Sequence, residues 1–166
     1  SYIAQPIFSQ NQRSKISLDP KPLKKHVKKL SIDFHPRNYK NLKNLNRSKK
    51  YIFEEFKKIS PYVRFQDFEV LGETYSNVIC KPYQQDSDEV LVIGAHYDSH
   101  AHTPGADDNA SGVAGLIELG HLLKKHPIAF KNIEMVAYTL EEPPFFRTNQ
   151  MGSAIHARSL KKQNKK

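Results

Sequence analysis

The spacing of apolar residues along this 166-residue chain changes between two periods, and each period predicts a different kind of element. Apolar positions that recur about every 3.6 residues predict helices over residues 22–32, 48–59, 110–126 and 150–162. Ser48 is expected to cap the second helix, Pro61 to end it and Pro127 to stop the third. The segment just before Ser48 predicts a turn or a short helix.

Shorter runs that are rich in β-branched and aromatic residues predict strands at residues 63–71, 75–81, 90–95 and 132–139. Gly72-Glu73 lies between the first two strands and predicts a hairpin. The last two strands enclose the helix over 110–126, and a strand, a helix and a strand in this order predict a parallel crossover. The predicted fold class is therefore α/β, with a mixed sheet.

The charge of the chain and its single cysteine narrow the classes of function. The net charge is +9, and the excess of basic residues between Lys21 and Lys58 is interpreted as a solvated helical face. No zinc-finger or aromatic RNA-binding motif accompanies these lysines, so no nucleic-acid partner is expected. No apolar run approaches the roughly 20 residues that a membrane span needs, and the first residues carry no secretory signal. Cys80 lies in a strand-like run, which predicts a buried, inert thiol.

Acidic and imidazole side chains follow the last two predicted strands. His96 and Asp98 come directly after the strand over 90–95, and the pair Glu141-Glu142 follows the strand over 132–139. Between them, Gly105 and Gly112 bound an acidic turn that opens a helix and contains Asp107-Asp108. Open α/β sheets bind their ligands at the carboxyl ends of strands. The arrangement indicates the divalent-metal site of a hydrolase.

These segments together resemble the zinc-dependent aminopeptidase family called peptidase family M28. The family pattern is a His-x-Asp after a strand, a Gly-Ala-Asp-Asp-x-Ala-Ser-Gly turn, and a Glu-Glu pair after the next strand; all three occur here in that order. The stretch from Glu142 to Thr148 is similar to a bacterial branch of that family. The resemblance covers residues 50–160 and implies a hydrolase-like α/β architecture with helices on both faces of the sheet.

The resemblance also implies roles for individual residues. It implies that His96, Asp108 and Glu142 bind zinc, with Asp108 bridging two ions in the complete domain. It makes Asp98 the residue beside His96 that orients the imidazole ring, and Glu141 the general base. It further implies a cis peptide bond between Asp108 and Asn109.

The family pair of zinc ions needs two further ligands, a carboxylate and a histidine, that lie downstream of the Glu-Glu segment. We therefore expect residues 1–20 to form an irregular arm and residues 21–166 to form an incomplete catalytic domain that binds zinc weakly or not at all. A sheet cut in this way would expose an edge, so a dimer or aggregation is expected. The resemblance favours a periplasmic or secreted location.

Three functions remain open from the sequence. The leading hypothesis is an aminopeptidase that acts on peptides with a free N-terminus. The second is a glutaminyl cyclase, an acyltransferase that shares this fold and uses one zinc ion. The third is a non-catalytic binding module on the same fold. Ser99 and Ser111 lie in no Gly-x-Ser-x-Gly elbow, which argues against a serine hydrolase.

Overall fold

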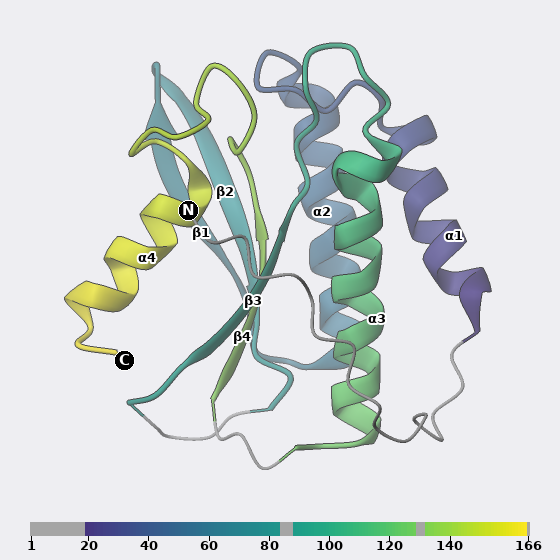
Figure 1. Cartoon of the computed structure of the whole chain (residues 1–166), viewed down its shortest axis with the longest axis vertical. Helices are drawn as coiled ribbons and strands as arrows, with labels where there is room; N and C mark the ends of the chain where they lie inside the picture. Colours follow the sequence, from purple (N-terminus) through teal and green to yellow (C-terminus); the bar gives the residue numbers. More distant parts are fainter. Residues whose placement is uncertain (1–18, 84–87, 129–131, 166) are drawn as a thin grey trace, which may run out of the picture.

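The chain forms a four-stranded mixed sheet with helices on both faces (Figure 1), which confirms the predicted α/β class. This computed structural model describes residues 19–83, 88–128 and 132–165. The helices are α1 (Pro20–Lys28), α2 (Leu42–Ile59), α3 (Gly112–Lys125) and α4 (Gly152–Lys162). The strands are β1 (Val63–Val70), β2 (Glu73–Cys80), β3 (Leu91–His96) and β4 (Ile133–Tyr138). Two π-helical segments, η1 (Lys29–Asp33) and η2 (Ala106–Ser111), continue α1 and precede α3.

The strands lie in the order β1-β2-β4-β3. β1 and β2 form the predicted antiparallel hairpin, in which Val70 pairs with Glu73 across a turn where Leu71 and Gly72 both have positive φ. β2 is antiparallel to β4, whereas β3 is parallel to β4. The crossover from β3 through α3 to β4 is therefore parallel, as predicted.

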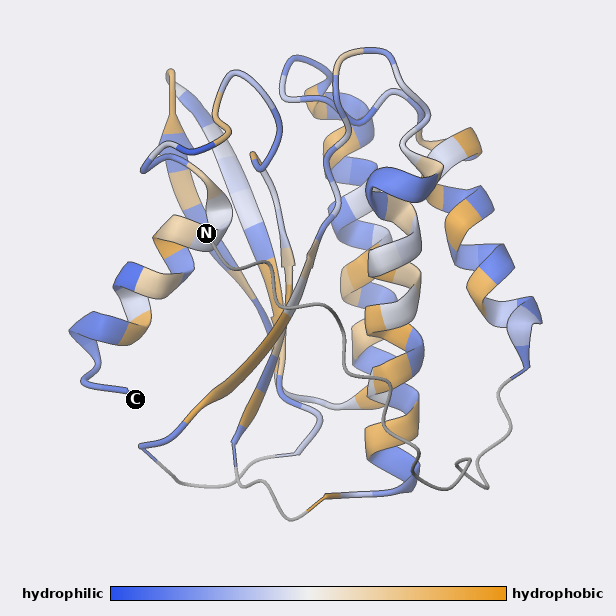
Figure 2. Cartoon of the chain, in the orientation of Figure 1, coloured by the Kyte–Doolittle hydropathy of each residue, from blue (hydrophilic) through white to orange (hydrophobic). Residues whose placement is uncertain are grey.

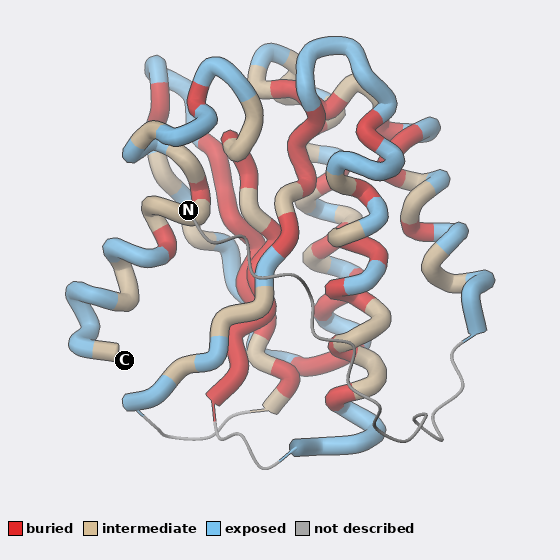
Figure 3. The backbone as a smooth tube through the Cα atoms, in the orientation of Figure 1, coloured by how far each residue is buried: buried red, intermediate tan, exposed pale blue. Residues whose placement is uncertain are grey.

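The two faces of the sheet are covered unequally. α1, α2 and α3 cover one face and α4 covers the other (Figure 1). β4 is buried along almost its whole length (Figure 3). Ile133, Met135 and Ala137 belong to the core on the side of the three helices, while Glu134 on the opposite face contacts His156 of α4. Both outer helices, α1 and α4, alternate polar and apolar residues along their length (Figure 2).

The start of α2 was predicted too late. The helix begins at Leu42, and Ser48 lies inside it, buried, with its hydroxyl donating to the carbonyl of Asn44 at 3.0 Å. A serine within a helix can bond back to the preceding turn as well as cap an N-terminus. Leu45 is buried one turn before Ser48, so the apolar stripe extends further towards the N-terminus than expected.

Other predictions have mixed outcomes. Residues 1–18 of the expected arm lie outside the described residues, and Pro20, its last residue, already belongs to α1. Cys80 is fully buried, as predicted, and burial raises the pKa of its thiol to about 12. Among the helices that the structure describes, none combines the length and apolar character needed to cross a membrane.

Candidate metal centre

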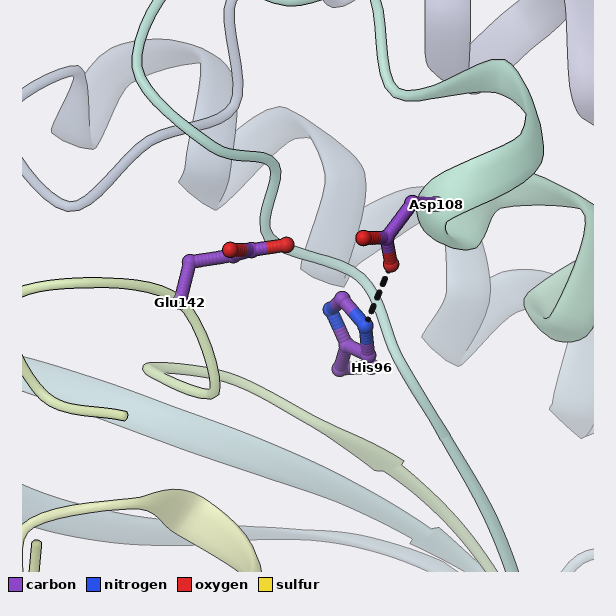
Figure 4. Close-up of side chains that lie close together, drawn as sticks. All are labelled: His96, Asp108 and Glu142. Atoms are coloured by element: carbon purple, nitrogen blue, oxygen red, sulfur yellow. Dashed lines mark ion pairs between the residues drawn. The ribbon is translucent and has the colours of Figure 1, made fainter. Parts of the chain in front are cut away.

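Three of the predicted ligands converge at the carboxyl ends of β3 and β4 (Figure 4). His96 is the last residue of β3 and pairs with Tyr138, the last residue of β4. Glu142 follows β4 after a short loop, and Asp108 lies in η2, just before α3. One ligand atom from each of His96, Asp108 and Glu142 lies within 4.8 Å of the other two. The order of the strands explains the convergence, because parallel neighbours end at the same edge of a sheet.

Carboxylates contact His96 on both ring nitrogens. Nε2 lies 2.9 Å from Oδ1 of Asp108, and Nδ1 lies 3.5 Å from Oδ1 of Asp98 and 3.2 Å from its backbone carbonyl oxygen. Burial lowers the pKa of His96, but the hydrogen bond and charge of Asp98, with the charges of Asp108 and Glu142, outweigh burial and raise it to about 9. The surroundings therefore favour a positive charge at this position, which either a proton or a metal ion supplies.

Asp98 also holds the Glu142 segment in place. Its side chain is buried, and Oδ2 accepts a hydrogen bond of 3.1 Å from the backbone N–H of Glu142. Oδ1 faces Nδ1 of His96 at 3.5 Å. Asp98 thus lies beside the histidine, as the resemblance implied, and additionally ties the ends of β3 and β4 together.

The turn that carries Asp108 has a constrained backbone. Gly105 has φ +57°, and a Cβ there would lie 2.6 Å from the carbonyl oxygen of Asp108, so no other residue fits without displacement. The side chain of Asn109 accepts a hydrogen bond of 2.9 Å from the N–H of Gly112. The Asp108–Asn109 peptide bond is cis, as expected from the resemblance.

Glu141, the predicted general base, faces a different partner from Glu142. Its Oε1 accepts from the N–H of Ser153 at 2.7 Å and its Oε2 from the Ser153 hydroxyl at 2.8 Å, at the start of α4. Burial raises the pKa of Glu141, the Ser153 bonds oppose this shift, and the charge of Asp98 adds to it. Burial and the charge of Asp108 likewise raise the pKa of Glu142. The sequence assigned no role to Ser153, although it lies in a stretch that contributes to the resemblance.

Arg37 is a second residue that the sequence did not single out. It is fully buried, and its guanidinium group donates to four backbone carbonyls, those of Leu30, Tyr97, Pro104 and Gly105, at 2.7–2.9 Å. Burial lowers its pKa to about 10, an effect that Asp98 opposes. Arg37 therefore fastens both ends of the loop that joins Asp98 to the Asp108 turn.

The donor set fits a divalent transition metal. One imidazole nitrogen and two carboxylate oxygens are ligands that zinc accepts, and three protein ligands are typical of catalytic zinc sites. The Asp108 side chain is 73% exposed, so a further position beside it is open to water or substrate. Metal-ligating histidines usually donate their second ring N–H to a carboxylate or a carbonyl oxygen. Asp98 provides such a carboxylate, because it faces Nδ1 of His96.

Comparison with known proteins supports this interpretation. YfbL of Escherichia coli K12, an uncharacterized protein, is 45% identical over 151 residues, which are 86% of this chain and 46% of YfbL. The aminopeptidase YwaD of Bacillus subtilis is 30% identical over 93 residues, or 55% of this chain and 20% of YwaD. The chain thus spans less than half of the length of both relatives. A glutaminyl cyclase from an Acidobacteriales bacterium has a TM-score of 0.73 at 20% identity, over 95% of this chain and 59% of that one, which shows a common fold.

The family model covers the segments that build the centre. It is that of peptidase family M28, and it matches residues 77–166, a range that includes His96, Asp108 and Glu142. The motifs of the sequence, the convergent side chains and this match agree. The chain belongs to peptidase family M28.

Proposed function

We propose that this chain carries the metal centre of a zinc-dependent aminopeptidase. The convergence of the His96, Asp108 and Glu142 ligand atoms within 4.8 Å supports this most directly. The sequence likeness to an aminopeptidase supports the reaction class. The predicted substrate is a peptide with a free N-terminus.

In this proposal His96, Asp108 and Glu142 hold the ion. When bound, zinc polarises a carbonyl and lowers the pKa of water towards about 7. Asp98 fixes the ring of His96 through its contact with Nδ1, which leaves Nε2 for the metal. Nε2 of His96 and Oδ1 of Asp108, which lie 2.9 Å apart, are the atoms that would share the ion.

Glu141 is proposed as the general base. Its raised pKa favours proton acceptance near neutral pH more than that of an ordinary glutamate. Ser153 binds both carboxylate oxygens and so fixes the direction in which the remaining lone pairs point. Glu141 accepts the proton of the attacking water on its carboxylate and delivers it to the nitrogen of the leaving amine.

A fusion protein tests this reaction. Residues 1–166 are joined to the C-terminal part of YfbL that lies beyond its matched region, and zinc content is measured on the same preparation. We expect the fusion to release free amino acids from aminoacyl anilides. Glu141→Gln should lower turnover by about 10²–10⁴-fold, the usual contribution of a general base, with zinc content unchanged.

Two results would contradict the proposal. A zinc-loaded fusion that converts peptides with N-terminal glutamine into cyclised products, without releasing free residues, would identify a glutaminyl cyclase. A zinc-loaded fusion that performs neither reaction would favour a binding module.

A further inference from the structure

A cavity adjoins the metal centre on the side of Glu142. It has a volume of about 360 Å³, within the range of small-molecule sites. Three segments line it: residues 38–41 before α2, residues 100–102 after Asp98, and Pro143-Pro144. Because Pro143 directly follows Glu142, the cavity begins one residue from a proposed metal ligand.

The walls of this cavity are tied to one another. The Asn38 side chain donates to the carbonyl of Ala101, and its Oδ1 accepts from the N–H groups of Lys40 and Asn41 at 3.1 and 3.2 Å. The Tyr39 ring packs edge-on against Phe145, with centroids 5.2 Å apart. The cavity is thus formed before any ligand binds, which reduces the entropy lost on binding.

Amide, phenol and basic side chains line the cavity, and those that carry a charge near neutral pH are all basic. Lys40, His100 and His102 are exposed, and no hydrogen bond or ion pair joins their side chains to another described residue. None of the lining residues is acidic. An ammonium group donates only, and a histidine ring donates at least one N–H in every protonation state. The cavity therefore offers donors and positive charge to a ligand that only accepts.

We propose that this cavity binds a carboxylate of the substrate peptide, with Lys40 and His102 as its recognition groups. The inference rests on the proposed function, because the molecule expected to extend into this cavity is a substrate peptide whose scissile bond lies at the metal centre. The carboxylate has two sources, an acidic side chain or the C-terminus of a very short peptide. Either source gives a substrate class of acidic or short peptides rather than long neutral ones.

Three dipeptides of equal size separate these sources: Leu-Glu-amide carries a side-chain carboxylate, Leu-Gln a C-terminal carboxylate, and Leu-Gln-amide neither. Binding to the 166-residue chain is followed by NMR, from the shifts of the residue 38–41 amides and the His102 ring. We expect one or both carboxylate peptides to bind more tightly than Leu-Gln-amide.

Matched variants test the named side chains. Lys40→Gln and His102→Ala should each weaken carboxylate binding, for Lys40 by about fivefold, the upper range for an exposed charge pair. Lys43→Gln removes the same charge from an exposed neighbouring position that does not line the cavity, and should leave binding unchanged. Equal binding of all three peptides, or equal loss in Lys40→Gln and Lys43→Gln, would overturn the inference.

Zinc titration of the YfbL fusion described above, with and without Lys40→Gln, separates this inference from the proposed function. Lys40→Gln should keep the zinc affinity of the wild type, because Lys40 contacts no proposed ligand. A wild-type protein that binds zinc but does not prefer the carboxylate peptides would overturn only the cavity assignment. Failure of zinc to bind at the centre of the fusion would overturn the proposed function, and with it the assignment of the bound carboxylate to a substrate.

Discussion

Replacing Arg37 by methionine tests how the loop of the metal centre is held. Methionine has a similar length and keeps the apolar contacts of the arginine stem, but it cannot donate hydrogen bonds. The four carbonyl oxygens that Arg37 binds would each lose this donor. At about 1 kcal/mol for each lost hydrogen bond, the total is about 4 kcal/mol. Arg37→Met also removes the desolvation cost of burying the guanidinium charge, which offsets part of this loss.

A loss of about 3–4 kcal/mol is a large part of the roughly 5–15 kcal/mol that separates native from unfolded domains. The free energy of unfolding can be measured by urea titration with circular dichroism. Arg37→Lys keeps the charge but concentrates its donors on one atom. We therefore expect its free energy of unfolding to lie between those of the wild type and Arg37→Met.

Arg64→Met is the control for this experiment. Arg64 is exposed on β1, and its replacement should change the unfolding free energy by no more than about 0.5 kcal/mol. Amide exchange adds a local measure, because the N–H of Ser99 donates to the carbonyl of Arg37 and should exchange faster in Arg37→Met. If Arg37→Met and Arg64→Met unfold at the same urea concentration, Arg37 does not hold the loop as argued.

Three further predictions concern the rest of the fold. Burial raises the pKa of Cys80 and keeps the native thiol neutral. The contribution of this thiol to the free energy of unfolding should therefore be fully present below about pH 9 and be lost as the pH rises towards 12. A Cys80→Ala variant with the same pH dependence would contradict this. Gly105→Ala should lower the unfolding free energy by at least about 1–2 kcal/mol, whereas Gly115→Ala, where nothing lies within 4 Å of the added Cβ, should not destabilise; equal unfolding midpoints would refute the predicted clash. β1 and β3 are the outer strands of the described sheet, so we expect association through an edge at moderate concentration; a strictly monomeric chain in sedimentation would argue against it.

Local patterns predicted most elements but not their arrangement. The Gly72 turn and the apolar strand runs indicated the hairpin and the crossover correctly. Nothing local indicated that β4 lies between β2 and β3, because strand order depends on contacts between distant segments. Ser48 was misplaced since one residue type serves both helix caps and helix interiors.

The candidate site shows the same division. His96, Asp108 and Glu142 were proposed as ligands because they lie in three family motifs that follow one another in order, and the structure brings the three side chains together. Arg37 was overlooked because it lies among many surface lysines, and only its burial distinguishes it from them. Ser153, at the start of α4, donates a hydrogen bond to Glu141 after β4. This contact between separate segments becomes visible only in three dimensions.

The zinc affinities of variants at the adjacent residues Glu141 and Glu142 test the central claim most directly. Affinity is measured on the 166-residue chain by competition with a chromophoric chelator. Three protein ligands, one of them largely exposed, predict a site weaker than a four-ligand structural one. Losing a residue that only hydrogen-bonds to a metal ligand already lowers metal affinity by about tenfold or more. Glu142→Gln should therefore weaken zinc binding by at least about tenfold, whereas Glu141→Gln should leave it unchanged. Equal affinities for the wild type and Glu142→Gln, or a loss confined to Glu141→Gln, would contradict the metal centre described above.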